Sequence, residues 1–130
     1  MNITVVVDGG GSGCRLGAFD NHGCLCATTQ DGPASLSLGE EQAWKHIRSG
    51  ISSLAKQLGK PADWLPTHLC MGLAGSLQQS RREHFLSLMP KSIRAVLTTD
   101  GLGQLLGAAD GQAGACLCIA TASVLHWLDT

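Results

Sequence analysis

The stretch NITVVVDGGGSG, residues 2–13, decides the fold of this chain. Residues 2–8 are apolar and β-branched, which predicts a buried strand, and the glycine-rich sequence after them predicts a tight turn. Glycine lets a backbone approach a phosphate and turn its N–H groups toward it. The turn is not a Walker loop, because no G-K-S/T follows it, and it is not a dinucleotide fingerprint, because a second strand follows instead of a helix. The alternative is a glycine-rich hairpin that binds no ligand.

Two side chains beside this turn have suitable chemistry for a nucleotide. Asp8, at the end of the strand, is able to hold Mg²⁺, usually through water. Ser12 offers a hydroxyl to phosphate oxygens. The candidate phosphate loop therefore consists of Gly9, Gly10, Gly11, Ser12 and Gly13.

The pattern of the remaining chain predicts an α/β domain over residues 1–130. Strands are expected at 15–20 and 24–30, and the Asp-Asn-His-Gly turn at 20–23 makes them part of an antiparallel meander. Apolar residues at helical spacing predict a helix over 40–58, which Gly59 would cap. Further strands are expected at 67–73, 93–98 and 114–120, with the start of another at 124–128, and further helices at 77–88 and 100–109. The order β-β-β-α-β-α-β-α-β implies a mixed sheet with helices packed on its faces.

A second candidate site follows the strand predicted at 93–98. Asp100 lies in the sequence TTDG at 98–101, between that strand and a helix, and open α/β sheets bind ligands at the carboxyl ends of their strands. Asp100 is therefore a candidate general base toward a substrate hydroxyl. A helix cap is the alternative role for this side chain.

Two further small-residue segments are candidates for ligand contact. In IATAS, residues 119–123, the hydroxyls of Thr121 and Ser123 suggest a second phosphate loop, and an ordinary hairpin turn is the alternative. In GLAGS, residues 72–76, Gly75 allows close approach by a ligand or by another chain segment.

The six cysteines are expected to be free thiols that behave as small buried hydrophobes and bind no metal. The pairs at 24/26 and 116/118 have C-x-C spacing, whereas zinc sites use C-x₂₋₄-C or matching histidines. His46 and His84 are expected on the surface, as are the arginines 81 and 82, and the tryptophans are expected in the core or at a domain contact.

Composition excludes several classes of function. The chain has 130 residues and a net charge of −1, so it lacks the basic surface that nucleic acids require. No apolar run approaches the roughly 20 residues of a membrane helix, and no basic n-region precedes the first strand. We therefore expect a cytoplasmic protein with no membrane partner.

Together these segments resemble the BadF/BadG/BcrA/BcrD ATPase family, which includes bacterial glucosamine and N-acetylglucosamine kinases. VDGGGS at 7–12 is similar to the family's first phosphate motif, where Thr usually stands in place of Ser12. LAG at 73–75 and TDGLG at 99–103 are similar to two further family segments. The spacing agrees from residue 3 to about 125. The resemblance implies an RNase H-like domain of the actin-like ATPase fold, and an ATP-dependent sugar kinase.

The resemblance also implies roles for the candidate residues. Asp8 would organise Mg²⁺, and Asp100 would bind the sugar and act as the base. Ser35, the closest match to an Asn that touches the sugar in the family, and Gly75 would lie at the sugar. The ATP phosphates would be held by Gly9, Gly10, Gly11, Ser12 and Gly13, together with Thr121 and Ser123.

The chain departs from the family at residues 120–123, where G-T-G-S becomes Ala120-Thr121-Ala122-Ser123. If either alanine needs positive φ, the cost is on the order of 1 kcal/mol. A second domain after Thr130 is expected to carry the adenosine pocket, and the protein is expected to be a homodimer. The alternatives are an ATPase activator of a 2-hydroxyacyl-CoA dehydratase or benzoyl-CoA reductase, and a non-catalytic sugar-sensing homologue.

Overall fold

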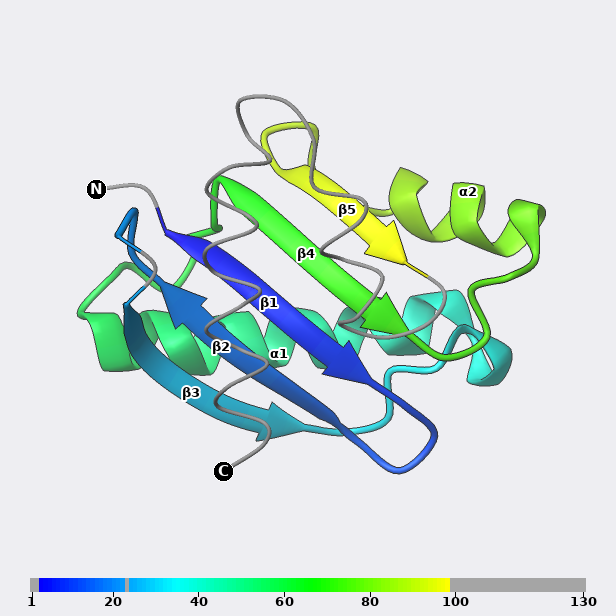
Figure 1. Ribbon diagram of the computed structural model, residues 1–130, viewed down its shortest axis with the longest axis horizontal. Helices are drawn as coiled ribbons and strands as arrows, with labels where there is room; N and C mark the ends of the chain where they lie inside the picture. Colours follow the sequence, from blue (N-terminus) through cyan, green and yellow to red (C-terminus); the bar gives the residue numbers. More distant parts are fainter. Residues whose placement is uncertain (1–2, 23, 99–130) are drawn as a thin grey trace.

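The computed structural model describes residues 3–22 and 24–98. Within them, five strands form one mixed sheet in the order β3-β2-β1-β4-β5 (Figure 1). In chain order the elements are β1 (Thr4–Gly9), β2 (Cys14–Phe19), β3 (Leu25–Asp31), the 3₁₀ turn η1 (Leu36–Leu38), α1 (Glu40–Leu58), β4 (His68–Leu73), α2 (Gln79–Ser87) and β5 (Arg94–Thr98).

The first three strands form the antiparallel meander that the turn residues predict. β1 pairs with β2 and β2 with β3, both antiparallel. The Asp20 carboxylate accepts hydrogen bonds from the backbone N–H groups of His22 and Cys24, at 2.9 and 3.0 Å, and so closes the second turn. These two bonds hold the pKa of Asp20 below its usual value, because they stabilise the charged carboxylate.

The other two strands add to β1 in parallel. β1 pairs with β4, and β4 with β5, so β1, β4 and β5 all point in the same direction. Parallel neighbours need a crossover, and α1 and α2 supply it. As a result, the carboxyl ends of three strands meet at one edge of the sheet (Figure 1).

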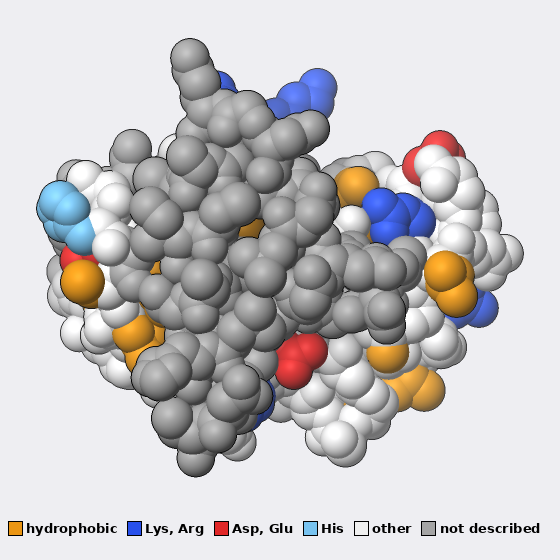
Figure 2. Space-filling view, in the orientation of Figure 1, with side chains coloured by type: hydrophobic (Ala, Val, Ile, Leu, Met, Phe, Trp, Pro, Cys, Tyr) orange, Lys and Arg blue, Asp and Glu red, His pale blue; other side chains and the backbone are white. Residues whose placement is uncertain are grey.

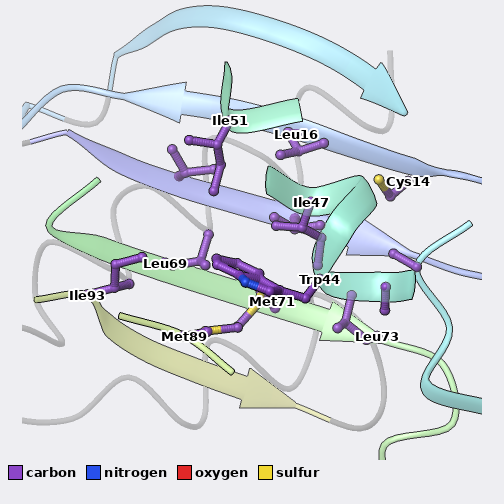
Figure 3. Close-up of a cluster of buried hydrophobic side chains, with 14 of the residues drawn as sticks. Cys14, Leu16, Trp44, Ile47, Ile51, Leu69, Met71, Leu73, Met89 and Ile93 are labelled. Carbon is purple, nitrogen blue, oxygen red and sulfur yellow. The ribbon is translucent and has the colours of Figure 1, made fainter. Parts of the chain in front are cut away.

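The core lies between one face of the sheet and the two helices. Alternate strand residues such as Val7, Leu16 and Met71 are fully buried against α1, from which Ile47 and Ile51 project (Figure 3). Their spacing along α1 is the helical period of 3.6, which also predicted the helix bounds. Burying each such side chain contributes about 1.5–3 kcal/mol, so this layer fixes the fold.

The C-terminal end of α1 has the glycine cap that the sequence predicts. Gly59 adopts φ 70° and ψ 28°, and its N–H bonds to carbonyls of the last turn of α1, so the predicted cap is confirmed. At the far end of the layer, Trp44 of α1 meets Phe85 of α2 edge to face, with ring centroids 6.4 Å apart and planes at 88°. Trp44 is therefore a core residue, as predicted.

Most of the predicted element order is confirmed. Every element predicted before residue 98 is present, with bounds that shift by one or two residues, and η1 was not predicted. The helix predicted at 100–109 and the strands predicted at 114–120 and 124–128 lie outside the described residues. Neither helix among the described residues is long and apolar enough to cross a membrane.

Several side-chain predictions were wrong. Cys14 and Cys70 are buried, but Cys24 and Cys26 are exposed, because Cys24 immediately precedes β3 and Cys26 belongs to it, and β3 is an edge strand of the described sheet. His84 is on the surface as predicted, with 47% of its side chain exposed. His46 is half-buried instead, since its Nδ1 lies 2.5 Å from the Pro33 carbonyl oxygen. The predicted surface arginines of α2 are half-buried as well.

Candidate active site

Three backbone hydrogen bonds join separate segments at the carboxyl edge of the sheet. The Ala74 N–H donates to the Gly9 carbonyl at 3.0 Å, which joins the ends of β4 and β1. The Ala34 N–H donates to the Gly10 carbonyl at 3.1 Å, and the Leu36 N–H to the Ala74 carbonyl at 2.9 Å. The structure thus brings together the glycine loop, the segment around Ser35 and the segment around Gly75, three of the sites that the sequence predicted.

The glycines of the loop differ in what surrounds them. A Cβ on Gly9 would lie 2.7 Å from Leu73 Cδ2 and 2.8 Å from Ala34 Cβ, so this glycine is required by close packing. A Cβ on Gly10 or Gly11 would meet no atom within 4 Å, and neither residue has positive φ. The backbone is therefore open at Gly10 and Gly11, where the predicted phosphate would lie.

The turn itself is closed by a backbone hydrogen bond. The Gly10 N–H donates to the Gly13 carbonyl at 3.0 Å, which closes the loop between β1 and β2. Ser12, at its tip, is exposed. Its hydroxyl is accordingly accessible to a ligand that enters from solvent.

A cavity of about 460 Å³ opens beside the loop. Asp8, Arg15 and Gln30 contribute to its wall, and they are register partners across three neighbouring strands. Partners in register point to the same face of a sheet, so the carboxylate, guanidinium and amide lie in one row. The full lining is Asp8, Gly9, Gly10, Ser12, Gly13, Cys14, Arg15, Gln30 and Asp31.

The charges of this cavity suit a magnesium–phosphate complex. Mg²⁺ is commonly bound through one or two carboxylates together with phosphate oxygens and water. Asp8 and Asp31 supply two carboxylates to the same cavity, and Arg15 supplies a positive group. Asp31 also accepts a hydrogen bond from the Gly32 N–H at 2.8 Å, which orients its side chain.

Cys14 shares this cavity but is a poor nucleophile. Burial raises the pKa of its thiol to about 11, and the negative charges of Asp31 and Asp8 add to the effect. The thiolate is the reactive form of cysteine, so this residue is chemically quiet at neutral pH.

Ser35 has a local structural role. Its side chain is only 5% exposed, donates to the Ala74 carbonyl at 3.3 Å and accepts from the Ser37 N–H at 3.3 Å. These bonds place it at the N-cap of η1. Gly75 adopts φ 78°, and a Cβ there would lie 2.6 Å from Ser37 N, so both its conformation and its surroundings require glycine.

The remaining candidates, Asp100, Thr121 and Ser123, lie outside the described residues. β5 ends at Thr98, at the same edge as the loop, two residues before Asp100 in the sequence. Arg15, Gln30 and Asp31 were not among the predicted site residues. The register of the meander identifies the first two, because it aligns Arg15 and Gln30 with Asp8, whereas Asp31 is the register partner of Cys14.

A second and larger cavity, of about 690 Å³, lies elsewhere along α1. Trp44, Trp64, Lys45 and Arg48 are among its lining residues. None of the predicted site residues and no glycine is among the described residues that line it. Its acidic lining residues are Glu41 and Asp63, which lie outside the strands. Residues of the predicted phosphate loop therefore line the smaller cavity and not this one. Figure 2 shows an acidic side chain at the surface near the carboxyl end of β1.

The sheet order, the antiparallel meander and the glycine loop after β1 define a domain of the actin-like ATPase fold, as predicted. No family model matches the sequence. The chain is 32% identical over 124 residues to glucosamine kinase GspK of Vibrio cholerae serotype O1 (strain ATCC 39315 / El Tor Inaba N16961); the match spans 95% of this chain and 42% of that protein.

A solved structure agrees with this relationship. A Chromobacterium violaceum protein, described as a candidate N-acetylglucosamine kinase, matches with a TM-score of 0.69 and 31% identity, over 86% of this chain and 40% of that one. The predicted resemblance is confirmed: homologues of this chain are amino-sugar kinases. The chain spans less than half the length of either relative.

Proposed function

We propose that this protein transfers the γ-phosphoryl group of ATP to a hydroxyl of an amino sugar, glucosamine or N-acetylglucosamine. The observation that carries the proposal is the open backbone at Gly10 and Gly11 beside the Asp8 carboxylate, at the edge where three parallel strands end. The names of the two relatives support the choice of substrate.

The glycine loop would bind the triphosphate. The N–H groups of Gly11 and Gly13 and the hydroxyl of Ser12 would donate to phosphate oxygens, and Thr121 and Ser123 would contribute from the second predicted loop. Arg15 adds a positive charge to the same cavity. Because phosphoryl transfer depends mainly on positioning and charge stabilisation, such a cradle supplies much of the catalysis.

Magnesium fits the acidic end of the cavity. Asp8, which lines this cavity together with Asp31, would hold the ion through water or directly, and the ion would neutralise charge on the β- and γ-phosphates. The role of the chain's own residues is to fix the carboxylates. Asp8 is fixed by its place in β1, between β2 and β4.

Asp100 would accept the proton of the reacting hydroxyl. In the step, the sugar oxygen forms a bond to the γ-phosphorus, the bond from that phosphorus to the bridging oxygen breaks, and ADP leaves. Ser35, already engaged with Ala74 and Ser37, would shape the sugar pocket through η1, and Gly75 would leave room for it.

A coupled assay of ADP release tests the proposal. The full-length protein is incubated with MgATP and, separately, glucosamine, N-acetylglucosamine and glucose, and the product is identified by mass spectrometry. We expect turnover that requires an amino sugar and yields a sugar phosphate. ATP hydrolysis that no sugar accelerates, or no turnover with any sugar, would contradict it.

Two broader expectations remain proposals as well. We propose that the protein acts in the cytoplasm, where ATP is supplied, and that it forms a homodimer. The exposure of Leu38 and Leu77, 60% and 84%, supports a protein contact near the strand ends. Light scattering at several concentrations measures the oligomeric state, and a monomer throughout would refute the dimer.

A further inference from the structure

Two adjacent arginines in the first turns of α2 reach main-chain carbonyls at the strand ends. Arg82 donates from Nη1 to the Ser76 carbonyl at 3.3 Å and from Nη2 to the Leu97 carbonyl at 3.1 Å. Arg81 donates from Nη1 to the Leu36 carbonyl at 2.6 Å, in η1. Figure 1 shows α2 alongside β5, and Figure 2 shows basic side chains among hydrophobic ones over α2.

One of the two carbonyls that Arg82 bridges belongs to β5, where Leu97 pairs with Met71 of β4, and the other belongs to the segment that follows β4 and lies outside the ladder. The ladder between β4 and β5 ends with the pair Gly72 and Thr98. Ser76 lies four residues past the end of that ladder on the β4 side. A guanidinium is a rigid planar fork, so one side chain that bonds both carbonyls fixes the distance between the two segments.

The helix that carries Arg82 is itself firmly held. Phe85 is fully buried and packs edge to face against Trp44 of α1. Arg82 is half-buried, which shields its hydrogen bonds from water and strengthens them. The anchor is therefore a packed element of the core, not a loop.

We infer that Arg82 is a positioning residue for the phosphoryl transfer: it holds the end of β5 against the segment that follows β4. This inference rests on the proposed function. Leu97, which accepts one of its bonds, precedes Asp100 by only three residues in the chain. Ser76, which accepts the other, is next to Gly75 in the predicted sugar segment. A small displacement of a reacting group has a large kinetic effect, because the transfer needs an in-line approach.

Arg82→Ala and Arg82→Lys in the full-length protein test the inference, and Arg48→Ala, an exposed arginine on α1, is the matched control. We expect Arg82→Ala to lower kcat by about 10- to 100-fold. The KM for MgATP should stay within about twofold of wild type, because the glycine loop is held by other bonds. Arg82→Lys keeps the charge but not the planar fork, so its kcat should fall between that of Arg82→Ala and that of wild type. The kcat of Arg48→Ala should match wild type.

Hydrogen exchange separates this inference from the proposed function. Arg82→Ala should speed amide exchange in peptides covering residues 94–102 and leave those covering β1 unchanged. A kcat within threefold of wild type in both Arg82 variants would overturn the inference. If wild type phosphorylates no sugar, the proposed function fails, and exchange alone decides the role of Arg82: faster exchange at 94–102 supports its hold on β5, and unchanged exchange overturns it.

Discussion

Gly9→Ala should lower the stability of the protein, whereas Gly10→Ala should lower its affinity for nucleotide, although the two residues are adjacent. A Cβ at Gly9 would lie 2.7 Å from Leu73 Cδ2, 2.8 Å from Ala34 Cβ and 2.9 Å from the Ala34 carbonyl oxygen. Two of these neighbours cannot move without shifting the backbone that joins β1 to the next segments. Gly9→Ala therefore overpacks a buried junction.

The size of this effect follows from the contacts. Overpacking a close-packed site costs about 1–3 kcal/mol. For a chain of this length, 1 kcal/mol lowers Tm by about 4 °C, so we expect Gly9→Ala to lower it by roughly 4–12 °C. At Gly10 no atom lies within 4 Å of a Cβ, and φ is not positive, so Gly10→Ala should change stability by at most about 0.5 kcal/mol.

Gly10→Ala should weaken nucleotide binding although it hardly changes stability. A methyl group there enters the cavity where the phosphates would lie, and we expect the Kd for MgATP to rise by about tenfold or more, equivalent to about 1.4 kcal/mol. Calorimetric melting and MgATP titration of both variants and wild type make the test. Equal Tm losses in the two variants would refute the packing argument, and unchanged MgATP affinity in Gly10→Ala would refute the phosphate loop.

Asp8→Asn should weaken binding of MgATP but not of ATP without Mg²⁺, as measured by titration with and without the ion; equal weakening in both would argue against a metal role. Exposed Cys24 should react with a thiol reagent well before Cys14, whose thiolate fraction at pH 8 is on the order of one in a thousand, and labelling of Cys14 should rise about tenfold per pH unit up to about pH 11. Fast labelling of Cys14 at pH 8 would contradict its burial. Replacing Ala120 and Ala122 with glycine should tighten ATP binding by about fivefold at each position that needs positive φ; an unchanged Kd in the double variant would show that neither does.

The parts of the fold that local chemistry determines were predictable. Helical periodicity and Gly59 gave the bounds of α1, and the Asp20 turn gave the meander, because both depend on residues close together in the sequence. The position of Asp8 and the glycine loop after β1 was predictable for the same reason.

The parts that depend on distant partners were not. η1 forms because Ser35 caps it and the Ala74 carbonyl accepts from Leu36, a contact between segments almost 40 residues apart. The arginines of α2 read as surface residues by period, yet Arg82 reaches the Leu97 carbonyl. Cys26 was expected to be buried because cysteine is usually a small buried hydrophobe. It is exposed instead, because β3 is an edge strand of the described sheet.

The most direct test of the central claim is the kcat of Asp100→Asn for amino-sugar phosphorylation. Exposed Asp63→Asn is the matched control, since it removes the same charge from a distant loop. If Asp100 is the general base at the strand ends, kcat should fall by about 10²–10⁴-fold while Tm and the Kd for MgATP stay near wild type. A kcat within threefold of wild type would contradict the account.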